Sequence, residues 1–105
     1  MIVRVWEAQV IPSRADAFCA ALLGGPLPDI RSVDGCIGAE LLRSVGDGDH
    51  RVMVVTRWQD EAALRAYAGP MWKIRPVWAE GELGYLEHPP SVSHFVPIAQ
   101  EVTAG

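Results

Sequence analysis

Of all segments in this chain, RVMVVTRW (residues 51–58) most restricts the possible folds. In a β-strand, alternate side chains point to opposite faces. Both faces of this strand are largely apolar: Val52, Val54, Thr56 and Trp58 lie on one, and Met53, Val55 and Arg57 on the other. We therefore expect both faces of the sheet that contains this strand to be covered.

Three other segments also predict β-strands. Residues 2–10 (IVRVWEAQV) are rich in β-branched side chains and place Arg4 and Trp6 on the same face. Residues 36–45 follow an Asp-Gly turn signal, and a Gly- and Asp-rich loop at 46–49 joins them to 51–58 as a hairpin. The last strand is expected at 91–98, where Pro97 confines it to a sheet edge or a strand end.

The first helix is expected to begin at Ser13, because Ser13 and Asp16 have the spacing of a capping box with Asp in place of Glu. Its apolar stripe comprises Ala15, Phe18, Ala21 and Leu22. The run from Gly24 to Pro28 interrupts this helix, since two glycines and two prolines do not continue it at low cost. A short helical turn is expected at residues 29–33.

A second helix is expected to begin after Asp60, its candidate N-cap, and to end at Gly69-Pro70. Its apolar side comprises Ala63, Leu64, Tyr67 and Ala68. The following stretch, MWKIRPVW (71–78), has two tryptophans and two cations around a proline. Because Pro76 disfavours a helical residue before it, we expect two short pieces here, with Pro76 at the first position of the second.

The order strand, helix, strand, strand, helix, strand predicts a ferredoxin-like βαββαβ fold of the α+β class, with a four-stranded antiparallel sheet and both helices on one face. We expect one domain at residues 1–98 and a frayed tail at 99–105. The other face of the sheet needs a cover, and a second copy of the chain is the simplest one. We therefore predict a homodimer in which Arg57 faces the partner and pairs with Glu40 or Glu7.

Composition and charge disfavour several classes of partner. The 105 residues have a net charge of −4 and no basic stripe, so nucleic acid is not an expected partner. No run of apolar residues is long enough to span a membrane, and the expectation is a soluble cytoplasmic protein. Cys19 and Cys36 lack a CxxC spacing, and His50, His88 and His94 are dispersed, so no metal site is expected.

Four segments resemble the antibiotic biosynthesis monooxygenase domain family of dimeric α+β barrels: MIVRVWEAQVIPSRADAF, GCIGAELLRSV, VVTRWQDEAALRAYAGP and HFVPI. The most specific piece is Trp58 at a strand end, followed by a polar turn and an "AL" helix. The resemblance implies a cavity between the sheet and its two helices. For members that are enzymes, it implies oxidation of electron-rich polycyclic phenols by dioxygen, with neither metal nor flavin, so no cofactor is expected.

One departure from the family is that this chain has no asparagine. Quinone-forming members use an asparagine where this chain has Val54, and haem-degrading members rely on a set of Asn, Trp and His. The position of the haem-ligating histidine falls near Arg75-Pro76. Haem degradation is therefore not expected, and neither known set of catalytic residues is complete.

The candidate pocket is expected to hold a flat aromatic molecule, with dioxygen as co-substrate if the protein is catalytic. His94 is the candidate general base, and Arg75 or Lys73 would stabilise the substrate anion. The expected pocket-lining residues are Thr56, Trp58, Tyr67, Trp72 and Trp78. Each has a structural alternative: core packing for the tryptophans, a strand former for Thr56, a half-buried phenol for Tyr67 and a satisfied histidine for His94. A non-catalytic, ligand-sequestering or stress-response barrel and a purely structural dimerisation module are the alternative functions.

Overall fold

A four-stranded antiparallel sheet forms one layer of the protein, with the strand order β2-β3-β1-β4. The structure is a computed structural model that describes residues 1–46, 48, 50–77 and 80–99. The strands are β1 (Ile2–Gln9), β2 (Cys36–Arg43), β3 (Arg51–Trp58) and β4 (Ser91–Phe95). The hairpin-loop positions 47 and 49 and the tail positions 100–105 lie outside the described residues.

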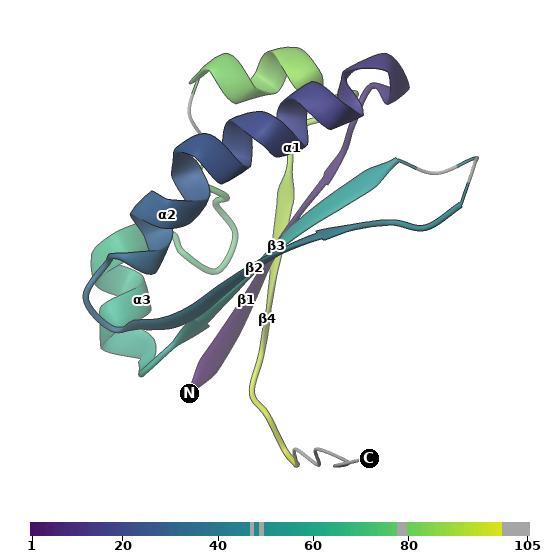
Figure 1. Ribbon diagram of the computed structural model, residues 1–105. Coiled ribbons are helices and arrows are strands. Elements are labelled where there is room, and N and C mark those ends of the chain that lie inside the picture. The colour runs from purple at the N-terminus through teal and green to yellow at the C-terminus, as the bar shows by residue number, and fades with distance from the viewer. Residues whose placement is uncertain (47, 49, 78–79, 100–105) are drawn as a thin grey trace, which may run out of the picture.

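The helices form a second layer on one face of this sheet (Figure 1). They are the 3-10 helix η1 (Pro12–Arg14), α1 (Ala15–Gly24), α2 (Pro26–Arg31), α3 (Glu61–Ala68) and the 3-10 helix η2 (Glu80–Tyr85). Strand order and layering are those of a ferredoxin-like α+β fold, which confirms the predicted fold class.

All four strands lie where they were predicted, but β1, β2 and β4 end earlier than expected. Strand β3 has the predicted bounds, whereas β4 ends at Phe95 instead of residue 98. Pro97 has no N–H to donate to a neighbouring strand, and residues 96–98 are exposed. The edge position predicted from Pro97 is confirmed, because β4 is the last strand of the sheet.

The predicted start of the first helix is wrong. Ser13 lies inside η1, and the N-cap of α1 is Arg14, which makes no capping bond through its side chain. Pro12 at the start of η1 already brings the chain into a helical turn, so Ser13 lies inside that turn, one residue before the N-cap of α1. Asp16 instead pairs with Arg43 on β2, with 2.6 Å between Oδ1 and Nη1.

The break between the first two helices is shorter than expected. Helix α1 ends at Gly24, as predicted, but α2 starts at Pro26 rather than near residue 29. Proline is well tolerated at the first helical position, because its missing N–H would have no partner within the helix there. The resumed helix buries Leu27 and extends the layer that covers the sheet.

Helix α3 has the predicted cap, stop and apolar side. The carboxylate of Asp60 accepts a hydrogen bond from the backbone N–H of Ala63, at 2.8 Å from Oδ1. Gly69 ends the helix with a φ of 87°, a conformation that favours glycine. Leu64 is fully buried against the sheet. These features position Tyr67 on the side of α3 that faces the sheet.

The opposite face of the sheet has no cover within the described chain (Figure 1). Leu42 and Phe95 on this face are 40% and 56% exposed. Arg57 pairs with Glu40 across 3.8 Å between Nη1 and Oε1, which confirms one of the two predicted partners, whereas Glu7 pairs with Arg51. None of the described helices is long and apolar enough to cross a membrane.

Candidate functional site

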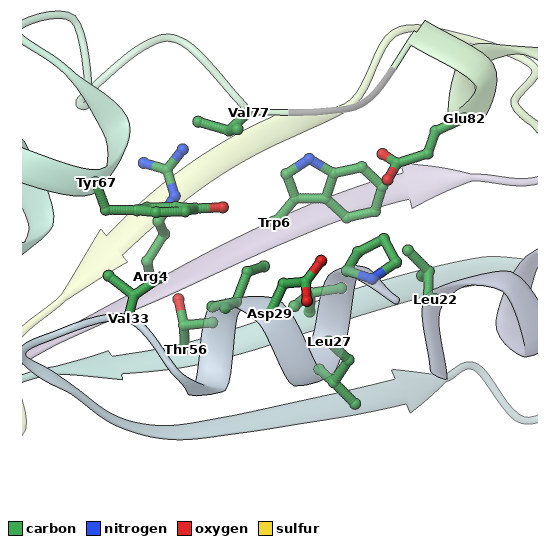
Figure 2. Close-up of a pocket in the computed structure, with 13 residues that line it drawn as sticks. Arg4, Trp6, Leu22, Leu27, Asp29, Val33, Thr56, Tyr67, Val77 and Glu82 are labelled. Carbon is green, nitrogen blue, oxygen red and sulfur yellow. The ribbon is translucent and has the colours of Figure 1, made fainter. Parts of the chain in front are cut away.

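A cavity of about 280 Å³ lies between the sheet and the helices (Figure 2). Its floor is formed by side chains of β1 and β3, one long wall by α1, α2 and the turn that follows them, and the other sides by α3, Val77 and η2. The cavity is mostly apolar. Its lining residues are Arg4, Trp6, Leu22, Pro26, Leu27, Asp29, Ile30, Val33, Val54, Thr56, Tyr67, Val77 and Glu82.

Arg4 on β1 is the buried cation of this pocket, at 3% exposure. Its Nη1 donates a hydrogen bond to the carbonyl oxygen of Trp72 at 2.7 Å and contacts Nε2 of His94 at 3.0 Å. Its Nη2 donates to the carbonyl oxygen of Arg75 at 3.1 Å. These contacts tie β1 and β4 to the segment after α3 and hold the guanidinium in place at the pocket.

No carboxylate within the described residues forms an ion pair with Arg4. Burial lowers the pKa of Arg4, and the nearby phenol of Tyr67 acts in the opposite direction. An arginine side chain nevertheless stays protonated in proteins. The pocket therefore has a positive charge that neutral groups solvate and that no described anion neutralises.

Tyr67 on α3 lies beside Arg4, with its hydroxyl directed toward Trp6 (Figure 2). Its ring stacks on that of Trp58, with centroids 5.0 Å apart and an interplanar angle of 24°. Burial raises the pKa of the Tyr67 phenol, and the charge of Arg4 opposes this effect. At neutral pH the phenol is therefore protonated and available as a hydrogen-bond donor.

Trp58 lies behind the ring of Tyr67 and does not line the pocket. It is fully buried, and its Nε1 donates to Oγ1 of Thr56 at 2.9 Å. Thr56 itself lines the pocket. Of these predicted site residues, Thr56 and Tyr67 therefore face the cavity, whereas Trp58 supports them from the core.

Trp72 and His94 contact Arg4 but do not line the cavity. Trp72 is buried with Trp58 and Leu64, and its ring meets that of His94 edge-on at 4.8 Å. The ammonium of Lys73 lies 5.4 Å from the centre of the Trp72 ring. Desolvation, followed by the charges of Arg4 and Lys73, lowers the pKa of His94.

Residues 71–77 form a turn followed by irregular chain. Backbone bonds from Ile74 and Arg75 to Met71 close the turn, and Pro76 and Val77 belong to no helix, so the expected second helical piece does not begin at Pro76. The side chain of Arg75 is exposed, and it is its carbonyl that contacts Arg4. Val77 lines the pocket, and Trp78 lies outside the described residues.

Two residues that line the pocket, Arg4 and Trp6, were not among the predicted site residues. The indole Nε1 of Trp6 is the only fully buried side-chain nitrogen or oxygen of the described chain without a hydrogen-bond partner. The sequence contained one signal for Arg4: in a strand with alternating faces, this arginine lies on the same face as the apolar residues Trp6 and Ala8. Such an arginine needs polar partners inside the protein.

No group of three or more His, Cys, Asp or Glu side chains among the described residues is placed to hold a metal ion. The polar groups that line the cavity include the donors of Arg4 and Tyr67 on one side, the carboxylate of Glu82 on the opposite side and that of Asp29 between them (Figure 2). This arrangement can orient a flat molecule and stabilise negative charge beside Arg4.

Fold and cavity together define a small ferredoxin-like α+β protein with an apolar pocket between its sheet and its helices. Residues 1–69 match the model of the antibiotic biosynthesis monooxygenase family, and the chain belongs to that family. None of the curated proteins matches the sequence.

Solved structures share this fold at low sequence identity. A monooxygenase from the gene ActVA-Orf6 of Streptomyces coelicolor, in complex with nanaomycin D, is 21% identical, with a TM-score of 0.74 over 98% of this chain and 92% of that one. The haem-degrader MhuD from Mycobacterium tuberculosis, with two haems bound in its active site, is 21% identical, with a TM-score of 0.69 over 97% of this chain and 100% of that one.

Proposed function

We propose that this protein oxidises a flat phenolic molecule with dioxygen, using neither metal nor flavin, in the pocket above β1 and β3. The observation that carries this proposal is the buried charge of Arg4 in an otherwise apolar pocket. An enzyme that activates its substrate as an anion needs such a charge where the anion forms. The monooxygenase from Streptomyces coelicolor that shares this fold, solved with nanaomycin D, supports an aromatic ligand.

The reaction needs few protein groups. A hydroxylated anthrone loses one proton from its ring CH₂ carbon, and the resulting anion passes electrons directly to dioxygen. One oxygen atom becomes the new carbonyl of the quinone and the other leaves as water, so that one anthrone and one dioxygen give one quinone and one water. Arg4 and the Tyr67 hydroxyl stabilise the negative charge on the substrate oxygen.

The proton acceptor must contact the substrate. His94 was the expected base, but its Nε2 contacts Arg4, and in this proposal it positions the guanidinium. The carboxylates that line the cavity belong to Asp29 and Glu82, and Glu82 lies on the opposite side of the pocket from Arg4 (Figure 2). In an anthrone, the CH₂ carbon lies across the central ring from the oxygen. A substrate oxygen at Arg4 therefore directs that carbon toward these carboxylates.

Oxygen consumption with a panel of hydroxylated anthrones and catechols tests this function. We expect uptake coupled to quinone absorbance, a loss of uptake in Arg4→Met, and a smaller loss in His94→Ala, which removes a support of Arg4. Arg65→Met is the matched control, because Arg65 is an exposed arginine on α3 that pairs with Glu61. Uptake that persists in a folded Arg4→Met protein would contradict the assigned role of Arg4.

The size of the cavity favours a ligand of two or three fused rings. Small-molecule sites measure roughly 300–1,000 Å³, and this cavity of about 280 Å³ is near the lower limit. A porphyrin needs more room. The chain also has no asparagine to complete the set on which haem-degrading members rely.

A ligand-sequestering protein is the second candidate function. The absence of asparagine favours it, because neither catalytic set described for the family is complete. Such a protein would bind the same phenols, with a rise in melting temperature and no oxygen uptake. A purely structural dimerisation module predicts a filled core, and the cavity argues against it.

We further infer that the protein is a homodimer joined through the open face of the sheet. The exposed apolar side chains of Leu42 and Phe95 support this assembly, as does the position of Arg57 and Glu40 on the same face. An apolar sheet face of this kind is normally covered in a soluble protein. A cytoplasmic location stays a prediction.

A further inference from the structure

Arg4 has hydrogen-bond donors left over for a ligand. A guanidinium has five N–H donors, and the three described contacts of Arg4 use both hydrogens of Nη1 and one of Nη2. Among the described residues, nothing accepts from Nε or from the second hydrogen of Nη2. Arg4 lines the pocket and its Nε is not fully buried, so a ligand there can accept a hydrogen bond from it.

Two more donors belong to the same pocket. The hydroxyl of Tyr67 is directed toward Trp6, and the phenol keeps its proton at neutral pH (Figure 2). The indole Nε1 of Trp6, a residue 7% exposed, has no partner among the described residues. The Tyr67 hydroxyl is not fully buried, so a ligand in the pocket can accept a hydrogen bond from it, whereas Nε1 of Trp6 is closed off from the pocket in this structure.

The two acidic side chains of the pocket lie away from Arg4. Figure 2 shows Arg4 and Tyr67 together on one side and Glu82 on the opposite side, with Asp29 between them on α2. A second negative charge on a ligand would therefore approach Glu82 and Asp29 and be repelled. The pocket is electrically asymmetric along its length.

We propose that the ligand is a flat aromatic monoanion with an acidic group, such as a carboxylate or an acidic phenol, which binds the free donors of Arg4 and the hydroxyl of Tyr67. Its uncharged end lies toward Asp29 and Glu82. This inference rests on the proposed function for the choice of pocket, but it concerns binding and requires no oxidation.

Three matched compounds without an oxidisable phenol test the proposal: a naphthalene monocarboxylate, its carboxamide, and the naphthalene dicarboxylate with an acid at either end. Binding to the full-length protein is measured by titration calorimetry and by quenching of tryptophan fluorescence. We expect the monocarboxylate to bind about tenfold or more tightly than the carboxamide, because hydrogen bonds to a charged group are the stronger ones. The dicarboxylate is expected to bind more weakly than the monocarboxylate.

Variants assign this preference to Arg4. Arg4→Met should abolish the difference between acid and amide, Arg4→Lys should keep part of it, and Arg65→Met should leave it unchanged. Tyr67→Phe, which keeps the ring that stacks on Trp58, should reduce the difference without unfolding the protein. If Arg4→Met does not fold, the comparison of acid and amide on the wild-type protein and on Tyr67→Phe remains decisive.

Equal binding of acid and amide to the wild-type protein would overturn the proposal, as would a preference that persists in folded Arg4→Met. Dicarboxylate binding as tight as that of the monocarboxylate would overturn the assigned orientation. The result is independent of catalysis. A preference for the acid without oxygen uptake by any phenol supports this inference and contradicts the proposed enzyme activity. Oxygen uptake without a preference for the acid supports the enzyme activity and contradicts this inference.

Discussion

Nη1 of Arg4 and Nε2 of His94 lie 3.0 Å apart, on residues that are directly opposite each other on the neighbouring strands β1 and β4. An arginine can only donate, so Nε2 must accept, and the proton of a neutral His94 must be on Nδ1. The contact therefore exists only while His94 is uncharged. This makes the position of the pocket cation depend on the protonation of a residue outside the pocket.

The first prediction concerns stability against pH. The pKa of His94 is lowered below its ordinary value of 6.5, chiefly by desolvation, so the unfolded chain binds more protons in this range than the folded one. The contribution of His94 to stability is therefore fully present above the unfolded pKa and is lost as pH falls through the folded pKa. Urea denaturation from about pH 7.5 to about pH 5 measures it.

His94→Gln is the matched variant, because a glutamine oxygen can accept from Arg4 and does not titrate. We expect its free energy of unfolding to fall less steeply over the same range of pH than that of the wild-type protein. Parallel curves for the two proteins would show that His94 carries no pH dependence.

The second prediction concerns the bond from Trp58 to Thr56. Both residues are buried, and the indole Nε1 donates to the hydroxyl at 2.9 Å. Thr56→Val keeps the shape of the side chain and leaves the indole donor without an acceptor, at a cost of about 1–3 kcal/mol in the free energy of unfolding. Thr56→Ser keeps the hydroxyl and should lose less. A valine variant as stable as wild type would show that the indole finds another acceptor.

Much of the fold could be predicted from local patterns. The bounds of β3 and the Asp60 cap of α3 follow from side-chain alternation and from the residues next to each element. The role of Arg4 could not be predicted in this way, because its partners are the carbonyls of Trp72 and Arg75 and a ring on β4, all far away in the sequence. Alternation predicts on which face of the sheet a side chain lies. It does not predict which distant residues contact that side chain in the folded protein.

The same reasoning explains why Trp72 was assigned to the pocket. Aromatic density near a proline is compatible with core and with site, and the choice depends on the turn at residues 71–74. That turn directs Trp72 against Trp58 and Leu64 and leaves its carbonyl facing Arg4. The backbone of this segment, rather than its tryptophan, serves the candidate site.

The third prediction concerns Gly35, which precedes β2 with a φ of 84°. A Cβ added there would overlap the Cβ of Ala63 on α3, and an alanine in this conformation costs about 1–2 kcal/mol by itself. We expect Gly35→Ala to destabilise the protein by more than about 2 kcal/mol. The double variant Gly35→Ala, Ala63→Gly should regain the steric part alone. Urea denaturation of the wild-type protein, both single variants and the double variant gives a double-mutant cycle. If the change in the free energy of unfolding in the double variant equals the sum of the two single changes, residues 35 and 63 do not interact.

The fourth prediction concerns the open face of the sheet. If two copies pair through it, a charge placed on Leu42 becomes buried against the partner without a counter-ion, which association does not tolerate. We expect the wild-type protein to show twice the chain mass of 11.4 kDa by light scattering, and Leu42→Glu to show the single mass. Leu23→Glu is the matched control, because Leu23 is 57% exposed on α1, on the helical side. A wild-type protein of single mass, or a Leu42→Glu protein that stays a dimer, would remove this face from the assembly.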